Sequence, residues 1–295
     1  MITTALLMTF SEAPTLATRG YGPDREWRAH LKLRLVPAAG KTRLKKLAFA
    51  GPLRIQRPFY PEGGVCHLYV LHPPGGLVSG DRLHIEVAAE AGSQSLLTIP
   101  SAGKIYGRDS DGVAQGQSVL LQLSDNAECE WLPQETIVYR GANALLDTHI
   151  ELSRDARFIG WDLVCLGRPA AGEIFDEGSL SQRIRLWRDG RMLLNERLQL
   201  NGDTDIRRSR VGLAGSSVFG TLLASGPGLN EALITALREA LPSPDFTVTE
   251  RLGVLLVRYL GDDMNRCRDG MWQAWTLIRP ILLARPACIP RIWLT

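Results

Sequence analysis

The 295-residue sequence has few of the features that mark enzymes, secreted proteins or membrane proteins. Its five cysteines are scattered, and no two of them form a C-x-x-C pair. An odd set of separated thiols is typical of a reduced intracellular protein and argues against a disulfide framework or a zinc site. No stretch reaches the roughly 18 apolar residues that a membrane-spanning helix needs. We therefore expect a cytoplasmic protein that does not enter a membrane.

Signals for nucleotides and nucleic acids are also missing. The phosphate-loop pattern G-x-x-x-x-G-K-[ST] is absent, because Gly103-Lys104 is followed by Ile105 and lacks the earlier glycine. The 34 basic and 31 acidic residues leave a formal net charge of only +3, with no basic tract. We expect neither nucleotide hydrolysis nor nucleic-acid binding by this chain.

The sequence is instead rich in strand patterns. Leu31, Leu33 and Leu35 alternate with polar residues, which places the three leucines on one face of a strand. Further strand-like segments lie at residues 82–88, 119–123, 147–152, 157–166 and 181–187. Asp189-Gly190 has the composition of a hairpin turn. Short strands separated by frequent turns predict a sandwich, a barrel or a solenoid.

Helix signals come only near the end of the sequence. Asn230 is placed to cap a helix that Pro242 would stop, and Asp262 or Asp263 is placed to cap a last helix. The apolar stripe of this last helix is Met264, Cys267, Met271, Trp275, Ile278 and Leu282, with Trp272 beside it as the candidate for exposure. Pro280 is expected to kink or end it.

The domain organisation is simple. Residues 1–27 are predicted to form a loose tail, because the apolar start lacks the basic region of a signal peptide. Residues 28–295 are predicted to form one β-rich domain, within which residues 246–260 make a strand pair or one long strand. We find no internal repeat in the sequence.

The densest motif is HPPGGLVSGD, residues 72–81. Pro74-Gly75 fits the two central positions of a type II turn. Gly76 and Gly80 would let another chain segment or a small ligand approach the backbone. The alternative is an ordinary tight connection in which Asp81 caps backbone amides.

Groups suited to metals or to acid–base chemistry are present without a diagnostic spacing. Cys66, His67, His72 and His84 lie in one stretch, which suits either structural roles or a weak nickel contact. The carboxylates Glu128, Glu130 and Glu135 surround Trp131 and suit either a solvated rim or an acid–base pair. The pair would make the protein a carbohydrate-active hydrolase built on a β-solenoid or sandwich. A third alternative is an adaptor unrelated to nickel.

Five blocks of the sequence together resemble one family. They are HPPGGLVSGD at 72–81, TIPSAGKIYGR at 98–108, EWLPQETIVYRGA at 130–142, GRPAAGEIF at 167–175 and RPACIPRIWLT at 285–295. In this order they resemble the UreD (UreH) family of urease accessory proteins, from about residue 30 onward. Gly103 and Gly107 depart from the residues usual in that family.

The resemblance implies a mainly β, β-helix-like or solenoidal body with two helices near the C-terminus. It implies a non-enzymatic scaffold whose partners are the urease accessory proteins F and G (UreF and UreG) and the urease apoprotein. It implies assistance to nickel insertion, with no tightly bound cofactor and with Ni²⁺ in transit through an internal tunnel.

Within the matched blocks two sets of residues follow from the resemblance. Weak oxygen ligands can pass a dication along without trapping it. The carboxylates expected on the nickel path are Asp81, Glu130, Glu135 and Glu173. The residues expected to build the structural motif are His72, Pro73, Pro74, Gly75, Gly76 and Gly80.

Overall fold

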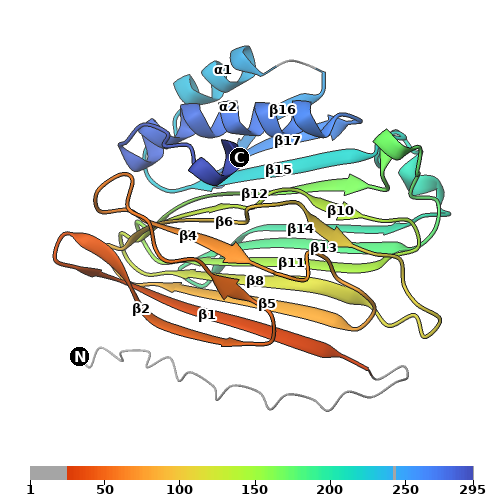
Figure 1. Cartoon of the computed structure of the whole chain (residues 1–295). Helices are drawn as coiled ribbons and strands as arrows, with labels where there is room; N and C mark the ends of the chain where they lie inside the picture. The colour runs from red at the N-terminus through yellow and green to blue at the C-terminus, as the bar shows by residue number, and fades with distance from the viewer. Residues whose placement is uncertain (1–24, 242–243, 295) are drawn as a thin grey trace.

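A computed structural model describes residues 25–241 and 244–294 of the chain (Figure 1). The strands are β1 (Trp27–Ala38), β2 (Lys41–Ala50), β3 (Arg54–Ile55), β4 (Cys66–Leu71), β5 (Asp81–Ala89), β6 (Gln94–Thr98), β7 (Gly103–Ile105), β8 (Gln115–Leu123), β9 (Glu128–Leu132), β10 (Thr136–Val138), β11 (Asn143–Leu152), β12 (Arg157–Leu166), β13 (Ser179–Arg188), β14 (Arg191–Asn201), β15 (Val218–Ser225), β16 (Phe246–Arg251) and β17 (Val254–Gly261). The α-helices are α1 (Glu231–Ala240) and α2 (Met264–Leu283), and short 3-10 helices lie at Pro169–Ala171, Asp205–Arg207 and Arg291–Leu294.

The strands form two large sheets that pack face to face, with both helices on the outer face of one of them (Figure 1). The first sheet has the order β14-β13-β11-β8-β5-β1-β2. The second has the order β16-β17-β15-β12-β9-β6-β4-β3. One apolar core lies between the sheets, and a second lies between the second sheet and the helices.

The central part of the chain coils between the two sheets. Strands β5, β8, β11 and β13 enter the first sheet as parallel neighbours, while β4, β6, β9 and β12 enter the second sheet in the same way. Each coil therefore gives one strand to each sheet, which is the arrangement of a β-helix. The predicted β-helix-like body with two late helices is confirmed.

This coil is a structural repeat that the sequence does not reveal. One set of connections is short, at residues 90–93, 124–127 and 153–156. The other set is long and variable, at residues 72–80, 99–114, 133–142 and 167–178. Because the long connections differ in length, successive coils are out of phase in the sequence and show no fixed period.

The strand patterns explain the core between the sheets. Leu31, Leu33 and Leu35 of β1 are all buried there, as their alternation predicts. Strand β12 is apolar on both faces except at Asp162, because it packs on the first sheet through one face and on the helices through the other. The 246–260 segment is a strand pair, β16 and β17, and Asp189-Gly190 turns the β13–β14 hairpin with positive φ at both residues.

The helices begin where their caps predict. The Asn230 side chain accepts a hydrogen bond from the Leu233 amide at 2.9 Å, and the Asp263 side chain accepts one from the Asn265 amide at 2.8 Å. Helix α2 continues through Pro280 to Leu283. Trp275 is buried against the sheet, whereas Trp272 is half-buried and stacks on Trp293, with ring centroids 5.0 Å apart.

The start of the described chain is already ordered. Strand β1 begins at Trp27, whose amide donates a hydrogen bond to the Gly80 carbonyl at 2.7 Å. The remainder of the predicted tail, residues 1–24, lies outside the described residues. Within residues 25–241 and 244–294, no helix is long and apolar enough to cross a bilayer.

Candidate functional site

Four of the family-like blocks are equivalent parts of successive coils. They cover or overlap the long connections at residues 72–80, 99–114, 133–142 and 167–178, which lie beside one another along one edge of the β-helix. We call this edge the motif edge. Strand β7 pairs with β10, and β10 pairs with β12, so the long connections are themselves joined by backbone hydrogen bonds.

Side chains along the motif edge contact one another from coil to coil. A Cβ atom on Gly76 would lie 2.4 Å from the Tyr106 ring, so only glycine fits there. Tyr106 packs edge-on against Tyr139 at 5.0 Å between centroids, and the Arg168 guanidinium lies 4.9 Å from the Tyr139 ring centroid. The approach that the glycines allow is thus used by this chain itself.

The turn prediction for the HPPGGLVSGD block was wrong by one residue. The Gly75 amide donates to the His72 carbonyl at 2.9 Å, so Pro73-Pro74 are the central pair and Gly75 follows them. A second turn is closed by the Asp81 amide and the Val78 carbonyl at 3.0 Å, with Gly80 at a φ of 87° in its third position. A type II turn needs positive φ at that third position, which Gly80 occupies, whereas Gly75 has a φ of 76° at the fourth position of the first turn.

Asp81 caps a backbone amide, as expected if the HPPGGLVSGD block is an ordinary tight connection. One of its carboxylate oxygens accepts a hydrogen bond from the Val78 amide at 2.9 Å. Asp81 is buried at the first position of β5 and faces the space between the sheets. Burial raises the pKa of this carboxyl, although the Val78 amide opposes the change.

Glu130 lies on the opposite face of the second sheet, under α2. Its carboxylate accepts hydrogen bonds from Trp275 Nε1 at 2.7 Å and from Arg279 Nε at 2.9 Å. Arg279 also binds Glu62 at 2.6 Å, and the Glu130 and Arg279 side chains are 0% exposed. Burial alone would raise the pKa of Glu62, but the hydrogen bonds and charges of His67 and Arg279 outweigh it and bring that pKa down to about 2. These contacts fasten α2 to the coil.

Glu135 and Glu173 also have arginine partners. Glu135 accepts from Arg268 of α2 at 3.3 Å. Glu173 accepts from Arg168 at 2.6 Å and from the Arg140 amide at 3.2 Å, at the rim of a small pocket of about 250 Å³. The hydrogen bonds from Arg168 hold the pKa of Glu173 below its usual value. Contact of any of the four carboxylates with Ni²⁺ stays a prediction, and the fold does not bring the four together.

The fold also separates the thiol and the three imidazoles that the sequence suggested for a weak nickel contact. Cys66 faces the core between the sheets, and His67 contacts Glu62 at 2.6 Å on the opposite face. His72 is half-buried at the motif edge, where burial lowers its pKa, and His84 lies on the outer face of the first sheet. No group of three or more His, Cys, Asp or Glu residues in the described part of the chain is arranged to hold a metal ion.

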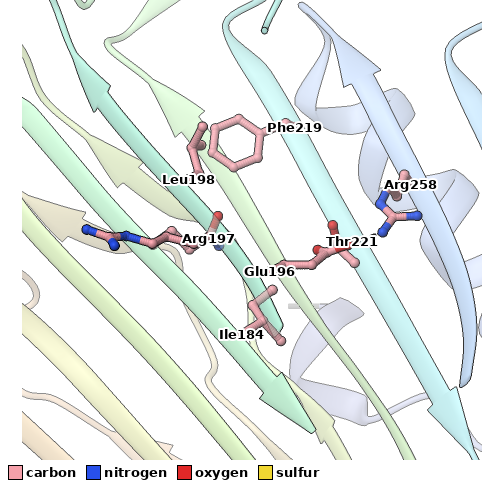
Figure 2. Close-up of a pocket in the computed structure, with 8 residues that line it drawn as sticks. Ile184, Glu196, Arg197, Leu198, Phe219, Thr221 and Arg258 are labelled. Carbon is pink, nitrogen blue, oxygen red and sulfur yellow. Dashed lines mark hydrogen bonds and ion pairs between the residues drawn. The ribbon is translucent and has the colours of Figure 1, made fainter. Parts of the chain in front are cut away.

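A polar pocket of about 340 Å³ opens between the two sheets where β14 faces β15 and β17. Figure 2 shows Glu196 near Thr221 and Arg258, while the Arg197 side chain extends away from them. Glu196 forms an ion pair with Arg258 across the gap between the sheets. The pocket therefore contains a carboxylate, a hydroxyl and a guanidinium in a space lined on its other sides by Ile184, Leu198 and Phe219.

Asp162 lies one strand deeper than this pocket. It is paired in register with Thr221, and it accepts a hydrogen bond from Thr148 of the facing sheet at 2.9 Å. Burial raises the pKa of Asp162 to about 6. Among the described residues no cation forms an ion pair with Asp162, which distinguishes it from Glu130, Glu135, Glu173 and Glu196. We call Thr148, Asp162, Gln182, Glu196, Thr221 and Arg258 the interior polar row.

Other polar atoms are buried toward the same side of the interior. Trp131 Nε1 and Gln115 Oε1 have no hydrogen-bond partner within residues 25–241 and 244–294. Gln115 begins β8, directly before Gly116, which is paired in register with Arg82 of β5. Buried polar atoms are normally satisfied by protein or by ordered water, so this side of the interior is suited to hydration.

Sequence analysis missed Asp162 and Glu196. The available signal was a single acidic residue inside the otherwise apolar segment RFIGWDLVCL, at a position where a buried strand rarely keeps a charge. Glu196 gave no signal, because its strand MLLNERLQL alternates in the manner of an ordinary exposed edge strand.

The fold and its sites define a β-helical protein whose largely apolar interior contains a row of polar side chains, and no acid–base pair is assembled among the residues that the structure describes. Each carboxylate that sequence analysis considered for a hydrolase is held by an arginine: Glu128 by Arg285, Glu130 by Arg279 and Glu135 by Arg268.

Comparison with known proteins agrees with this class. The UreD urease accessory protein family matches residues 28–294. A urease accessory protein UreD of Marinobacter nauticus is 46% identical over 283 residues, covering 93% of this chain and 95% of the relative. The UreD proteins of Chromohalobacter salexigens and Pseudoalteromonas translucida are 45% and 42% identical, covering 92% and 100% of this chain and 90% and 100% of the relatives.

This chain belongs to the UreD family of urease accessory proteins. That is a family of accessory proteins and not of enzymes, so the alternative prediction of a carbohydrate-active hydrolase is wrong.

Proposed function

We propose that the protein acts in the cytoplasm as a scaffold that binds apo-urease and accessory proteins F and G and assists nickel insertion. We further propose that Ni²⁺ crosses the body of the protein between its two sheets, along the interior polar row. The observation that carries this proposal is Asp162, a carboxylate placed between the sheets without a cationic partner among the described residues.

The chemistry of the row suits passage better than storage. Carboxylate, hydroxyl and amide oxygens bind Ni²⁺ more weakly than a cage of imidazoles and thiolates does. Arg258 neutralises Glu196, and a passing dication would compete with it for that carboxylate. Of the four carboxylates predicted from the sequence, Asp81 has the placement that best fits such a path, since it faces the interior at the motif edge.

Residues on and after α2 support the proposal of protein partners. Ile281, Ile289 and Leu294 keep 47%, 48% and 70% of their surface exposed. Large apolar side chains exposed near one element favour a protein contact there. We propose that one accessory protein covers this end of the helical layer.

The test is Asp162→Asn in cells that express urease and its other accessory proteins at limiting nickel. The amide has nearly the same shape but lacks the charge, so we expect a several-fold loss of urease activity and of nickel bound to urease. Capture of accessory protein F and apo-urease by the variant should be unchanged. Asp155→Asn, in a short connection away from the motif edge, is the matched control.

Two results would count against this route. If Asp162→Asn matures urease as well as the parent does at limiting nickel, Ni²⁺ does not depend on this carboxylate. If the variant loses its partners as well, the residue acts in folding or assembly and the interior route loses its support.

A further inference from the structure

Two histidines stack on the uncovered face of the first sheet. His30 of β1 and His84 of β5 are paired in register, with ring centroids 4.7 Å apart and ring planes 23° apart. No helix of the described chain packs on this face, because α1 and α2 both lie on the second sheet (Figure 1). The pair belongs neither to the interior polar row nor to the motif edge.

One of the two rings is held in place. His84 Nδ1 lies 2.6 Å from the Ser118 hydroxyl, on the next strand of the same face. Histidines that bind metals usually have one ring nitrogen fixed by such a partner, which directs the other nitrogen at the metal. Ser118 therefore orients His84 in the way that a metal ligand requires.

The other ring lacks a partner. Both nitrogens of His30 are buried without a hydrogen-bond partner in the part of the chain that the structure describes. Ala50, opposite His30 on β2, is small and leaves the ring room to turn. Burial also lowers the pKa of both imidazoles, which favours the neutral form that binds metals.

The surrounding charges are already paired. Lys32 binds Glu86 at 2.9 Å, while Glu26 binds Arg28 at 2.7 Å and Arg82 at 3.3 Å. Within the described residues, the charged side chains around the two imidazoles are thus held in ion pairs, whereas the imidazoles themselves are not.

We propose that His30 and His84 form a two-imidazole site for a divalent transition-metal ion such as Ni²⁺, with water in the remaining positions. The two stacked ring planes are nearly parallel, and a metal lies in the plane of each imidazole that binds it, so the His30 ring must turn out of the stack before both rings can bind one ion. Since neighbouring strands are about 4.8 Å apart, a ring turned in this way can place its nitrogen at the roughly 2.1 Å that metal–imidazole bonds need. Two ligands give an exchangeable site on the surface, separate from the proposed interior route.

The experiment titrates the purified full chain with NiCl₂, by calorimetry and by ¹H–¹³C spectra of the histidine rings. Paramagnetic Ni²⁺ should broaden the His30 and His84 signals first. Either His30→Asn or His84→Asn should weaken binding at least about tenfold, and Ser118→Ala should weaken it by about tenfold through the loss of ring orientation. His149→Asn is the matched control, since His149 lies on the same face but on β11.

The proposal is overturned if a chain that carries both His30→Asn and His84→Asn binds Ni²⁺ as tightly as the parent chain does, if the parent chain does not bind Ni²⁺, or if the signals of His149 and His72 broaden as early as those of His30 and His84. Asp162→Asn should leave this titration unchanged, so the outcome here is separable from that of the interior route. Thermal unfolding of each variant is measured alongside, so that weaker binding is assigned to the missing ligand only in a variant that is folded at the temperature of the titration.

Discussion

Replacing Asp162 by asparagine should make the protein more stable at neutral pH. Burial raises the pKa of this carboxyl from 3.8 to about 6. Since one pKa unit corresponds to about 1.4 kcal/mol, the charged form costs the folded state roughly 3 kcal/mol, and less where water reaches the carboxylate.

The sign follows from proton binding. Between pH 3.8 and about 6 the folded protein keeps a proton that the unfolded chain has released. The free energy of unfolding therefore falls as the pH rises through this interval, and the full penalty is present above it. Asp162→Asn removes both the penalty and its pH dependence, whereas the parent protein gains stability on acidification toward about pH 4 until other carboxylates protonate.

The assay is urea denaturation at several pH values between about 4 and 7.5, comparing Asp162→Asn with the parent. We expect a gain of about 2–3 kcal/mol at the upper pH and little difference at the lower one. Thr148→Val should have the opposite effect at the upper pH, because it removes the hydrogen bond to the charged carboxylate. A parent and an asparagine variant with equal stability and equal pH slopes would refute the reasoning.

Three other outcomes are expected. Arg279→Met should lower the free energy of unfolding by about 3–5 kcal/mol, because it removes the arginine that neutralises the buried carboxylates of Glu62 and Glu130. Arg266→Ala, at a partly exposed pair, should cost about 1 kcal/mol or less, and similar losses for the two variants in urea denaturation would contradict this. Gly75→Ala should lower the free energy of unfolding by about 1–2 kcal/mol because alanine is strained at this positive φ. Gly80→Ala should lower it further because the new Cβ would also lie 2.6 Å from a carbonyl oxygen. The reverse order of unfolding midpoints would show that this close approach is unimportant. Cys288 should react first with a thiol reagent, since the other four thiols are buried and burial raises their pKa values to about 11 or 12. Rapid labelling of a second thiol in the native protein would contradict the fold.

Local signals in the sequence predicted the elements well. Alternation placed Leu31, Leu33 and Leu35 in the core, and Asn230 and Asp263 marked the first turns of both helices. These signals act within a few residues, and so they survive in a single sequence. Resemblance to one family then predicted the β-helix-like body.

Contacts between distant residues could not be predicted in this way. The buried Glu130–Arg279 pair joins residues 149 positions apart, and nothing near either residue announces the other. The ladder of Tyr106, Tyr139 and Arg168 depends on coils whose connecting segments differ in length. Asp162 was overlooked because local rules treat an apolar strand as core, whereas only the stacked sheets reveal that its carboxylate faces a polar space.

The β-helix has short connections along one edge and long connections along the other, and this difference affects where insertions and deletions can be tolerated. The short connections at residues 90–93, 124–127 and 153–156 hold neighbouring coils in register through backbone bonds, such as that from the Gly92 amide to the Asp125 carbonyl. An insertion there would shift every later strand relative to its neighbour, and one residue of slip would turn core side chains outward. The motif edge already accommodates connections of unequal length, so natural variation in chain length should collect on that edge and leave the short turns unchanged.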